Sequence, residues 1–161
     1  MSSTIRNTLI LVLDASSSMN QFNQLKLLKV LSQTANEQEN ISRLVIIKFS
    51  NDCSIVLDEQ VPSGKTDLSI DKLSKIYQIN GSTALNDAIL MACDVTKHDT
   101  NEKQVVLIMT DGFENSSKVK KVEVVKEEIQ SAQQKEVVFI GLGFGKDIAK
   151  SYGLPEGKCI E

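Results

Sequence analysis

The sequence predicts an α/β fold in which a doubly wound, mostly parallel sheet is covered by helices on both faces. Four short apolar blocks rich in β-branched residues alternate along the chain with amphipathic stretches of helical period. Strands and helices that alternate in this way form an open parallel sheet. The length of 161 residues is close to the commonest for one domain, so we expect a single domain over residues 1–161.

The strands are predicted from short segments that are apolar throughout, as strands buried on both faces are. A further strand at Cys53–Leu57 follows the second block after only Asn51 and Asp52, which is too short for a parallel crossover. We therefore expect this strand to pair antiparallel at an edge of the sheet, and we expect a last strand at Lys158–Ile160. The four apolar blocks are Leu9–Leu13, Leu44–Phe49, Val105–Met109 and Val137–Leu142.

Three crossover helices are predicted from apolar residues that recur with helical spacing and so share one face. A loop at Pro62–Asp67 precedes a shorter helix at about Leu68–Tyr77, and a closing helix is expected at Asp147–Tyr152. The three apolar faces are Phe22, Leu25, Leu28, Leu31 and Ala35; Leu85, Ala88, Ile89 and Ala92; and Val122, Val125, Ile129 and Ala132.

Composition excludes several classes of function. The formal net charge is −3, and the 18 basic residues are dispersed among 21 acidic ones, so no basic stripe is available for nucleic acid. Residues 1–8 contain Arg6 as their only cation, and the apolar run that follows stops at Asp14. That run is too short for a signal sequence or a membrane span, so we expect a cytoplasmic protein without membrane contact.

The cysteines and the histidine do not suggest a further site. Cys53, Cys93 and Cys159 are odd in number and far apart, so they fit neither a disulfide framework nor a zinc spacing and are expected to be buried free thiols. The single histidine, His98, lies in a polar stretch that is typical of a solvated loop.

Polar side chains gather at the predicted carboxyl ends of the strands, where open parallel sheets bind their ligands. The first strand runs directly into Asp14-Ala15-Ser16-Ser17-Ser18, and the fourth ends in Thr110-Asp111-Gly112. Gly81-Ser82-Thr83 opens the helix between them. Taken singly, each segment also fits a helix N-cap or a turn. Their common placement at strand ends favours a shared site.

This site contains only oxygen ligands, which favours a hard divalent cation. Two carboxylates and three hydroxyls suit Mg²⁺ or Mn²⁺, and Ca²⁺ less well, whereas zinc and copper prefer nitrogen and sulfur. Three hydroxyls leave an octahedral ion short of ligands, so water held by the carboxylates and one carboxylate from outside would complete it. We therefore expect an acidic residue of a partner protein to bind through the metal. The candidate metal residues are Asp14, Ser16, Ser18, Thr83 and Asp111.

At these residues the chain resembles the von Willebrand factor A domain, whose metal-ion-dependent adhesion site is D-x-S-x-S followed by a Thr and an Asp. The resemblance implies that Ser16, Ser18 and Thr83 bind the metal directly, while Asp14 and Asp111 act mainly through water. It covers nearly the whole chain and implies that the first and fourth strands are neighbours. It also implies a likeness to small intracellular members, which often work with AAA-type ATPases or in larger assemblies.

Two further expectations concern the end of the chain and the residues next to the metal site. The chain ends at Glu161, about where a final helix usually follows in the family, so the conformational switching of that helix is not carried over. The residues that directly follow the metal residues are the expected partner-binding rim, with Phe113 favoured because an exposed aromatic is costly without a use. This rim consists of Met19, Asn20, Phe113, Glu114 and Asn115.

Enzymatic alternatives are weaker, and we expect no catalysis. A phosphatase of the haloacid-dehalogenase type also places an Asp after its first strand and binds Mg²⁺, but it needs a second Asp where this chain has Ser16. No G-x-x-x-x-G-K-[ST] or G-x-S-x-G motif is present, and the glycines after the fifth strand lack the dinucleotide spacing. The other alternative is a metal-independent scaffold of the same fold.

Overall fold

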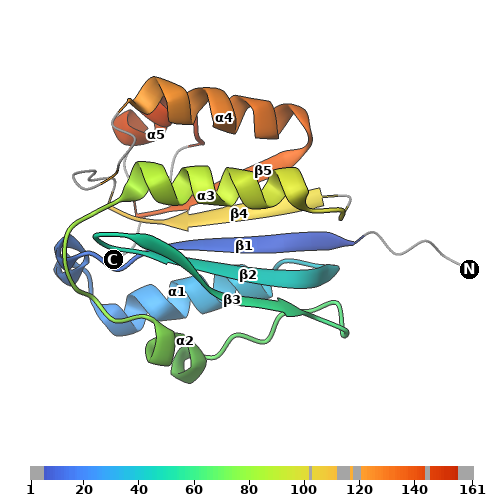
Figure 1. The fold of residues 1–161 in the computed structure, drawn as a ribbon. Helices are drawn as coiled ribbons and strands as arrows, with labels where there is room; N and C mark the ends of the chain where they lie inside the picture. Colours follow the sequence, from blue (N-terminus) through green and yellow to red (C-terminus); the bar gives the residue numbers. More distant parts are fainter. Residues whose placement is uncertain (1–5, 102, 112–116, 118–120, 144–145, 156–161) are drawn as a thin grey trace, which may run out of the picture.

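The computed structural model describes residues 6–101, 103–111, 117, 121–143 and 146–155, and it contains a sheet in the order β3-β2-β1-β4-β5 (Figure 1). All neighbouring strands are parallel except β3, which pairs antiparallel with β2 at one edge. The predicted fold class is therefore confirmed. The strands are β1 (Asn7–Asp14), β2 (Ile41–Phe49), β3 (Cys53–Gln60), β4 (Lys103–Met109) and β5 (Val137–Leu142).

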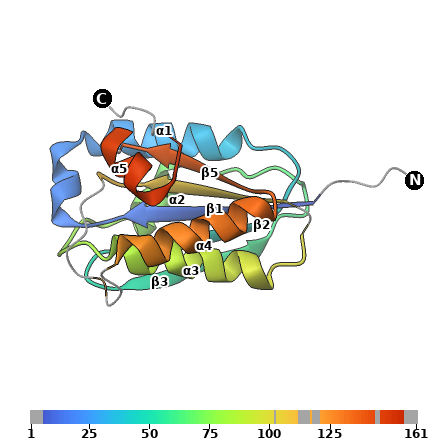
Figure 2. The same ribbon diagram turned by 90° about the horizontal axis from the view of Figure 1, so that it is seen from above.

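Helices cover both faces of this sheet, as Figures 1 and 2 show from two directions. Helices α1 (Gln24–Asn36) and α2 (Ile70–Ile76) lie on one face. The other face is covered by α3 (Leu85–His98), α4 (Val122–Gln134) and α5 (Lys146–Tyr152). A short 3₁₀ helix, η1 (Ser17–Gln21), connects β1 to α1 and was not predicted from the sequence.

Alternation along the strands supplies two separate cores, because successive side chains of a strand point to opposite faces. In β1, Leu9, Leu11 and Leu13 pack in the core beneath α1 and α2. Ile10 and Val12 pack in the core beneath α3, α4 and α5. All five side chains are buried, which explains why the strand is apolar throughout.

The four predicted apolar strands are confirmed, and three of them extend further than their apolar blocks. In β3 the pairing register shifts between Ile46 and Ile47 of the neighbouring strand, which indicates a β-bulge at this edge. The short helix α2 lies inside the segment expected to be helical, and the closing helix α5 is confirmed. The expected strand at Lys158–Ile160 lies outside the described residues.

The helical faces were predicted correctly for α3 and largely for α4, but one residue of the first face is wrong. In α3 every predicted face residue is buried, and in α4 only Val122 is partly exposed. In α1, Leu25 is 64% exposed, because the buried face is set by Leu27, Leu28 and Leu31 and Leu25 points away from it. None of the described helices is long and apolar enough to cross a membrane.

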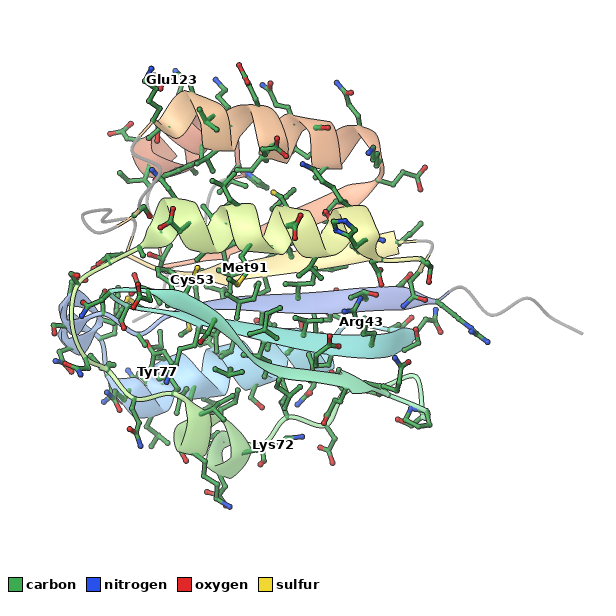
Figure 3. All side chains as sticks on the ribbon, viewed as in Figure 1. Arg43, Cys53, Lys72, Tyr77, Met91 and Glu123 are labelled. Atoms are coloured by element: carbon green, nitrogen blue, oxygen red, sulfur yellow. The ribbon has the colours of Figure 1, made fainter. Side chains whose placement is uncertain are left out.

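A polar network closes the end of the sheet where β1 begins. The Asp99 carboxylate accepts hydrogen bonds from the Thr8 hydroxyl and from Gln104 Nε2, and pairs with Arg43 Nη1 at 2.9 Å. Arg43, labelled in Figure 3, also makes two hydrogen bonds to Asp58 across the β2–β3 pair. These ion pairs connect β2, β3 and the residue after α3 at the end of the sheet that lies away from the candidate metal residues.

Candidate metal centre

The candidate metal residues lie where the strand order reverses around β1, which has β2 on one side and β4 on the other. Leu13 of β1 is paired with Met109 of β4, so Asp14 and Thr110 follow at the same edge of the sheet. As the resemblance implied, the first and fourth strands are neighbours. The structure therefore brings the polar segments that begin at Asp14 and Thr110 together, at a position typical of ligand binding in such sheets.

Asp14 is fully buried, and both of its carboxylate oxygens accept hydrogen bonds. Oδ1 accepts from the backbone N–H of Ser16 at 2.9 Å and from the Ser16 hydroxyl. Oδ2 accepts from the Thr110 hydroxyl at 2.7 Å. The Ser16 and Ser18 hydroxyl oxygens are 3.1 Å apart, so three of the five candidate residues form one connected group.

The electrostatics of this group would be relieved by a cation. Burial raises the pKa of Asp14, the hydrogen bonds from Ser16 and Thr110 lower it in part, and the charge of Asp111 raises it further. Removal of water and a neighbouring like charge both disfavour the ionised form. Among the described residues no three His, Cys, Asp or Glu side chains are grouped as a metal site. The expected site has only two carboxylates, so it would not form a group of that kind.

Thr83 is brought to the same edge by the loop between α2 and α3. Two backbone hydrogen bonds join this loop to the first polar segment: Asn80 N–H donates to Ala15 at 2.7 Å, and Ser17 N–H donates to Gly81 at 2.9 Å. Thr83 itself is 2% exposed and lies two residues before α3 begins at Leu85. Asp111 follows Thr110, whose N–H donates to Leu142 at 3.0 Å. The loop before α3 is thus joined to the first polar segment through Asn80 and Gly81, and Asp111 lies close enough for its charge to act on Asp14.

Of the expected rim, only Met19 and Asn20 lie among the described residues. Met19 is wrong as a rim residue, because the 3₁₀ helix turns its side chain into the core beneath α1, where it is fully buried. Asn20 is exposed, as expected of a residue at the surface. Phe113, Glu114 and Asn115 lie outside the described residues.

Two residues outside the candidate metal set contact Asp14. Thr110 binds its carboxylate, and the only signal was its position directly before Asp111 at the end of a strand. Tyr77, labelled in Figure 3, donates its hydroxyl hydrogen to the backbone carbonyl of Asp14. No sequence pattern predicts this second contact, because 63 residues separate the two positions.

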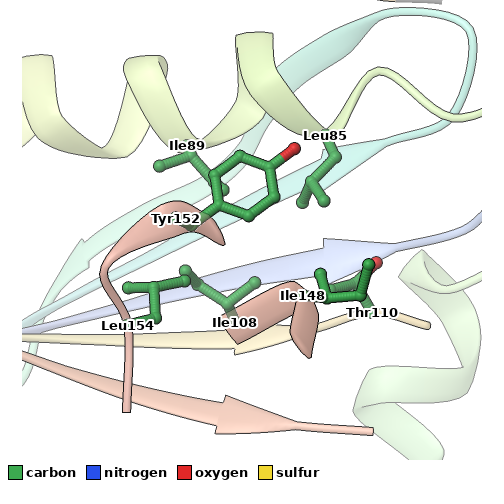
Figure 4. A pocket seen from close by; sticks show the side chains of 7 residues that line it. All are labelled: Leu85, Ile89, Ile108, Thr110, Ile148, Tyr152 and Leu154. Carbon is green, nitrogen blue, oxygen red and sulfur yellow. The ribbon is translucent and has the colours of Figure 1, made fainter. Parts of the chain in front are cut away.

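Behind Thr110 lies a small apolar cavity of about 10 Å³, shown in Figure 4. It is bordered by Leu85 and Ile89 of α3, by Ile108 of β4 and by Tyr152 of α5. A space of this size holds about one water molecule at most. It is therefore a packing gap beside the site and not a ligand pocket.

Comparison of the sequence with known proteins identifies the family to which this chain belongs. The model of the von Willebrand factor type A domain matches residues 8–153. An uncharacterized protein of Borreliella burgdorferi is 24% identical over 158 residues, which cover 95% of this chain and 46% of that protein. The chain therefore spans less than half the length of this relative.

Solved structures share the fold at low sequence identity. A von Willebrand factor type A protein from Catenulispora acidiphila is 14% identical with a TM-score of 0.63, over 96% of this chain and 38% of that one. The manganese-loaded TRAP protein of Plasmodium vivax is 17% identical with a TM-score of 0.58, over 87% of this chain and 58% of that one. Because the family model matches most of the sequence and the fold agrees, the chain belongs to the von Willebrand factor type A domain family.

Proposed function

We propose that this domain binds Mg²⁺ or Mn²⁺ at an intact metal-ion-dependent adhesion site and holds an acidic residue of a partner protein through that ion. The observation that carries the proposal is the buried Asp14 carboxylate, which accepts the hydrogen of the Ser16 hydroxyl. A hydroxyl that donates its hydrogen in this way keeps an oxygen lone pair for a cation. The metal residues would be Asp14, Ser16, Ser18, Thr83 and Asp111.

The donor set fits such an ion. Ser16, Ser18 and Thr83 would be the direct ligands, and Asp14 and Asp111 would balance the charge and hold bound water. The ion would supply a strong positive charge with a position open to an anionic oxygen. A carboxylate from a partner is the natural occupant, because hard cations prefer anionic oxygen.

The family supports an interaction role, since von Willebrand factor type A domains commonly serve as protein-interaction modules. The TRAP protein of Plasmodium vivax, whose structure is manganese-loaded, has the same fold and supports a divalent ion as the cofactor here. We propose a cytoplasmic setting, and the resemblance to the family implies an AAA-type ATPase or a larger assembly as the partner. We propose that the domain has no catalytic activity.

The contact surface around the ion would include residues that the structure leaves exposed. Asn20 is exposed in η1, and Leu25 lies in the first turn of α1, five residues further along the chain. That turn contains no acidic side chain, so it would not repel an acidic partner. Leu25 therefore replaces Met19 as the apolar contact that we expect at this edge.

Metal titration by calorimetry tests the first half of the proposal. Thr83→Ala should weaken Mg²⁺ and Mn²⁺ binding, because it removes one of three hydroxyl ligands. Thr66→Ala is the matched control: Thr66 is also buried, but its hydroxyl donates to the carbonyl of Ala35 at 3.0 Å. Equal metal affinity in wild type and Thr83→Ala would contradict the assigned site.

Binding of a partner tests the second half. A pull-down from the native host, performed with and without a chelator, should recover a partner only when the metal is present. Replacing the acidic residue of that partner by its amide should abolish the same interaction. If chelation and Thr83→Ala both leave the affinity unchanged, the domain binds its partner by surface complementarity alone, as a metal-independent scaffold.

A further inference from the structure

The loop that carries Thr83 is anchored at both ends but contains no regular structure between α2 and α3. Its first anchors are the hydrogen bonds to Ala15 and Ser17 described above. At its other end, Ala84 N–H donates to the Ser50 carbonyl, directly after β2, at 2.7 Å. The segment that leads into Thr83 therefore lies between the end of β1 and the end of β2.

Asn51, in the turn between β2 and β3, contacts the middle of this segment. Its side-chain oxygen Oδ1 accepts two hydrogen bonds from Ser82, one from the backbone N–H and one from the hydroxyl, both at 2.7 Å. One amide oxygen thus fixes both the peptide group and the side chain of the residue immediately before Thr83.

Gly81 shows how closely Asn51 is packed against the loop. Its φ of +82° is a conformation that L side chains rarely adopt, and a Cβ added there would lie 2.5 Å from Asn51 Oδ1. Such a contact is far inside van der Waals distance, so only glycine allows the amide to reach Ser82. Asn51 therefore contacts both residues that precede Thr83.

From this geometry we propose that Asn51 is a positioning residue that holds Thr83 in the geometry required by a small ion and thereby favours Mg²⁺ over Ca²⁺. The inference rests on the proposed function. Mg²⁺ requires near-ideal octahedral geometry at about 2.0–2.1 Å, whereas Ca²⁺ accepts longer and less regular contacts. A rigid ligand selects the smaller ion, and loosening it relaxes that selection.

Calorimetric titrations of Mg²⁺ and of Ca²⁺ into wild type and Asn51→Ala measure this effect. The variant should lose roughly 10- to 100-fold in Mg²⁺ affinity, the usual effect of removing a group that orients a metal ligand. Its Ca²⁺ affinity should fall by a smaller factor, so that the Mg²⁺/Ca²⁺ ratio decreases. Asp52→Asn, in the same turn, is the control and should leave the ratio unchanged.

A second measurement needs no metal. In the metal-free protein, amide hydrogen exchange at Ser82 should become faster in Asn51→Ala and stay slow in Asn51→Asp, which keeps an oxygen acceptor at the same place. Gly81→Ala should also speed this exchange, because its methyl group displaces the Asn51 side chain.

The outcomes separate the inference from the proposed function. If wild type binds metal but Asn51→Ala changes neither the ratio of affinities nor the exchange at Ser82, the role of Asn51 is overturned and the metal site stands. If wild type binds neither Mg²⁺ nor Ca²⁺, this inference is overturned, and if it does not bind Mn²⁺ either, the proposed function is overturned as well.

Discussion

Tyr77 donates its phenolic hydrogen to the backbone carbonyl oxygen of Asp14, so the residue that follows α2 is hydrogen-bonded to the last residue of β1. Tyr77 is buried, and burial raises its pKa further above the usual tyrosine value, with contributions from the charges of Asp14 and Asp111. The hydroxyl therefore remains protonated and acts as a donor at all pH values at which the protein is studied.

Tyr77→Phe should accordingly lower the free energy of unfolding by about 1–2 kcal/mol, because it leaves the buried Asp14 carbonyl without this donor. The ring and its packing are retained, so the loss reports on the hydrogen bond. Chemical denaturation of wild type and variant measures the difference. An unchanged unfolding free energy would mean that water or another group satisfies the carbonyl equally well.

The ion pair between Arg43 and Asp58 predicts a dependence of stability on pH. Its hydrogen bonds lower the pKa of Asp58 in the folded protein relative to the unfolded chain. The resulting stabilisation is present above the pKa of an unfolded Asp, about 4, and is lost as the pH falls through the folded value. Wild type should therefore be more stable than Asp58→Asn at pH 6.

This stability difference should be modest, since Asp58 is exposed to water, and it should shrink steadily in denaturation experiments below about pH 4. A difference between the two proteins that stays constant from pH 6 to pH 3 would show that the charge of Asp58 is not its source.

Leu25 should contribute to partner binding without contributing to stability. Leu25→Ser should leave the melting temperature nearly unchanged, because the side chain is exposed, and should reduce affinity for the native partner about fivefold or more. Val138→Ser is a suitable control, because Val138 is 52% exposed on β5, outside the proposed contact surface. Equal affinities of both variants and wild type would remove Leu25 from that surface.

Phosphate-ester hydrolysis should be undetectable. The Asp14 carboxylate is buried and occupied by hydrogen bonds from Ser16 and Thr110, which makes it a poor nucleophile. His98, the only histidine of the chain, ends α3, about 20 Å along the helix from Thr83. Turnover of a generic phosphate ester that disappears in Asp14→Asn would restore the phosphatase alternative.

The sheet could be predicted from sequence because the strands are buried on both faces and therefore apolar throughout. Periodicity also located α3 and α4, whose buried faces follow helical spacing along their whole length. It failed at Leu25, because Phe22 precedes the helix and cannot define the register of its first turn. Met19 was misplaced for a different reason: it was named because it follows Ser18, and the 3₁₀ helix that begins at Ser17 turned its side chain inward.

The candidate metal residues could be named from sequence because each follows a strand or opens a helix. Their supporting contacts could not be named in this way. Tyr77 and Asn51 reach the site from turns far along the chain, and both are recognised only when the fold brings those turns together. Polar residues in turns have many other uses, so their types alone did not distinguish them.

The proposed function depends most directly on whether the folded protein binds a divalent ion at Asp14, and thermal unfolding with added Mg²⁺ or Mn²⁺ measures this binding. At a metal concentration 100 times the dissociation constant, an ion that binds only the folded state stabilises it by about 2.7 kcal/mol. This should raise the wild-type midpoint by roughly 5–10 °C. The midpoints of Asp14→Ala and of Ser18→Ala, whose side chain is exposed, should move much less. Equal shifts in wild type and both variants, or no shift in wild type, would contradict the proposed metal site.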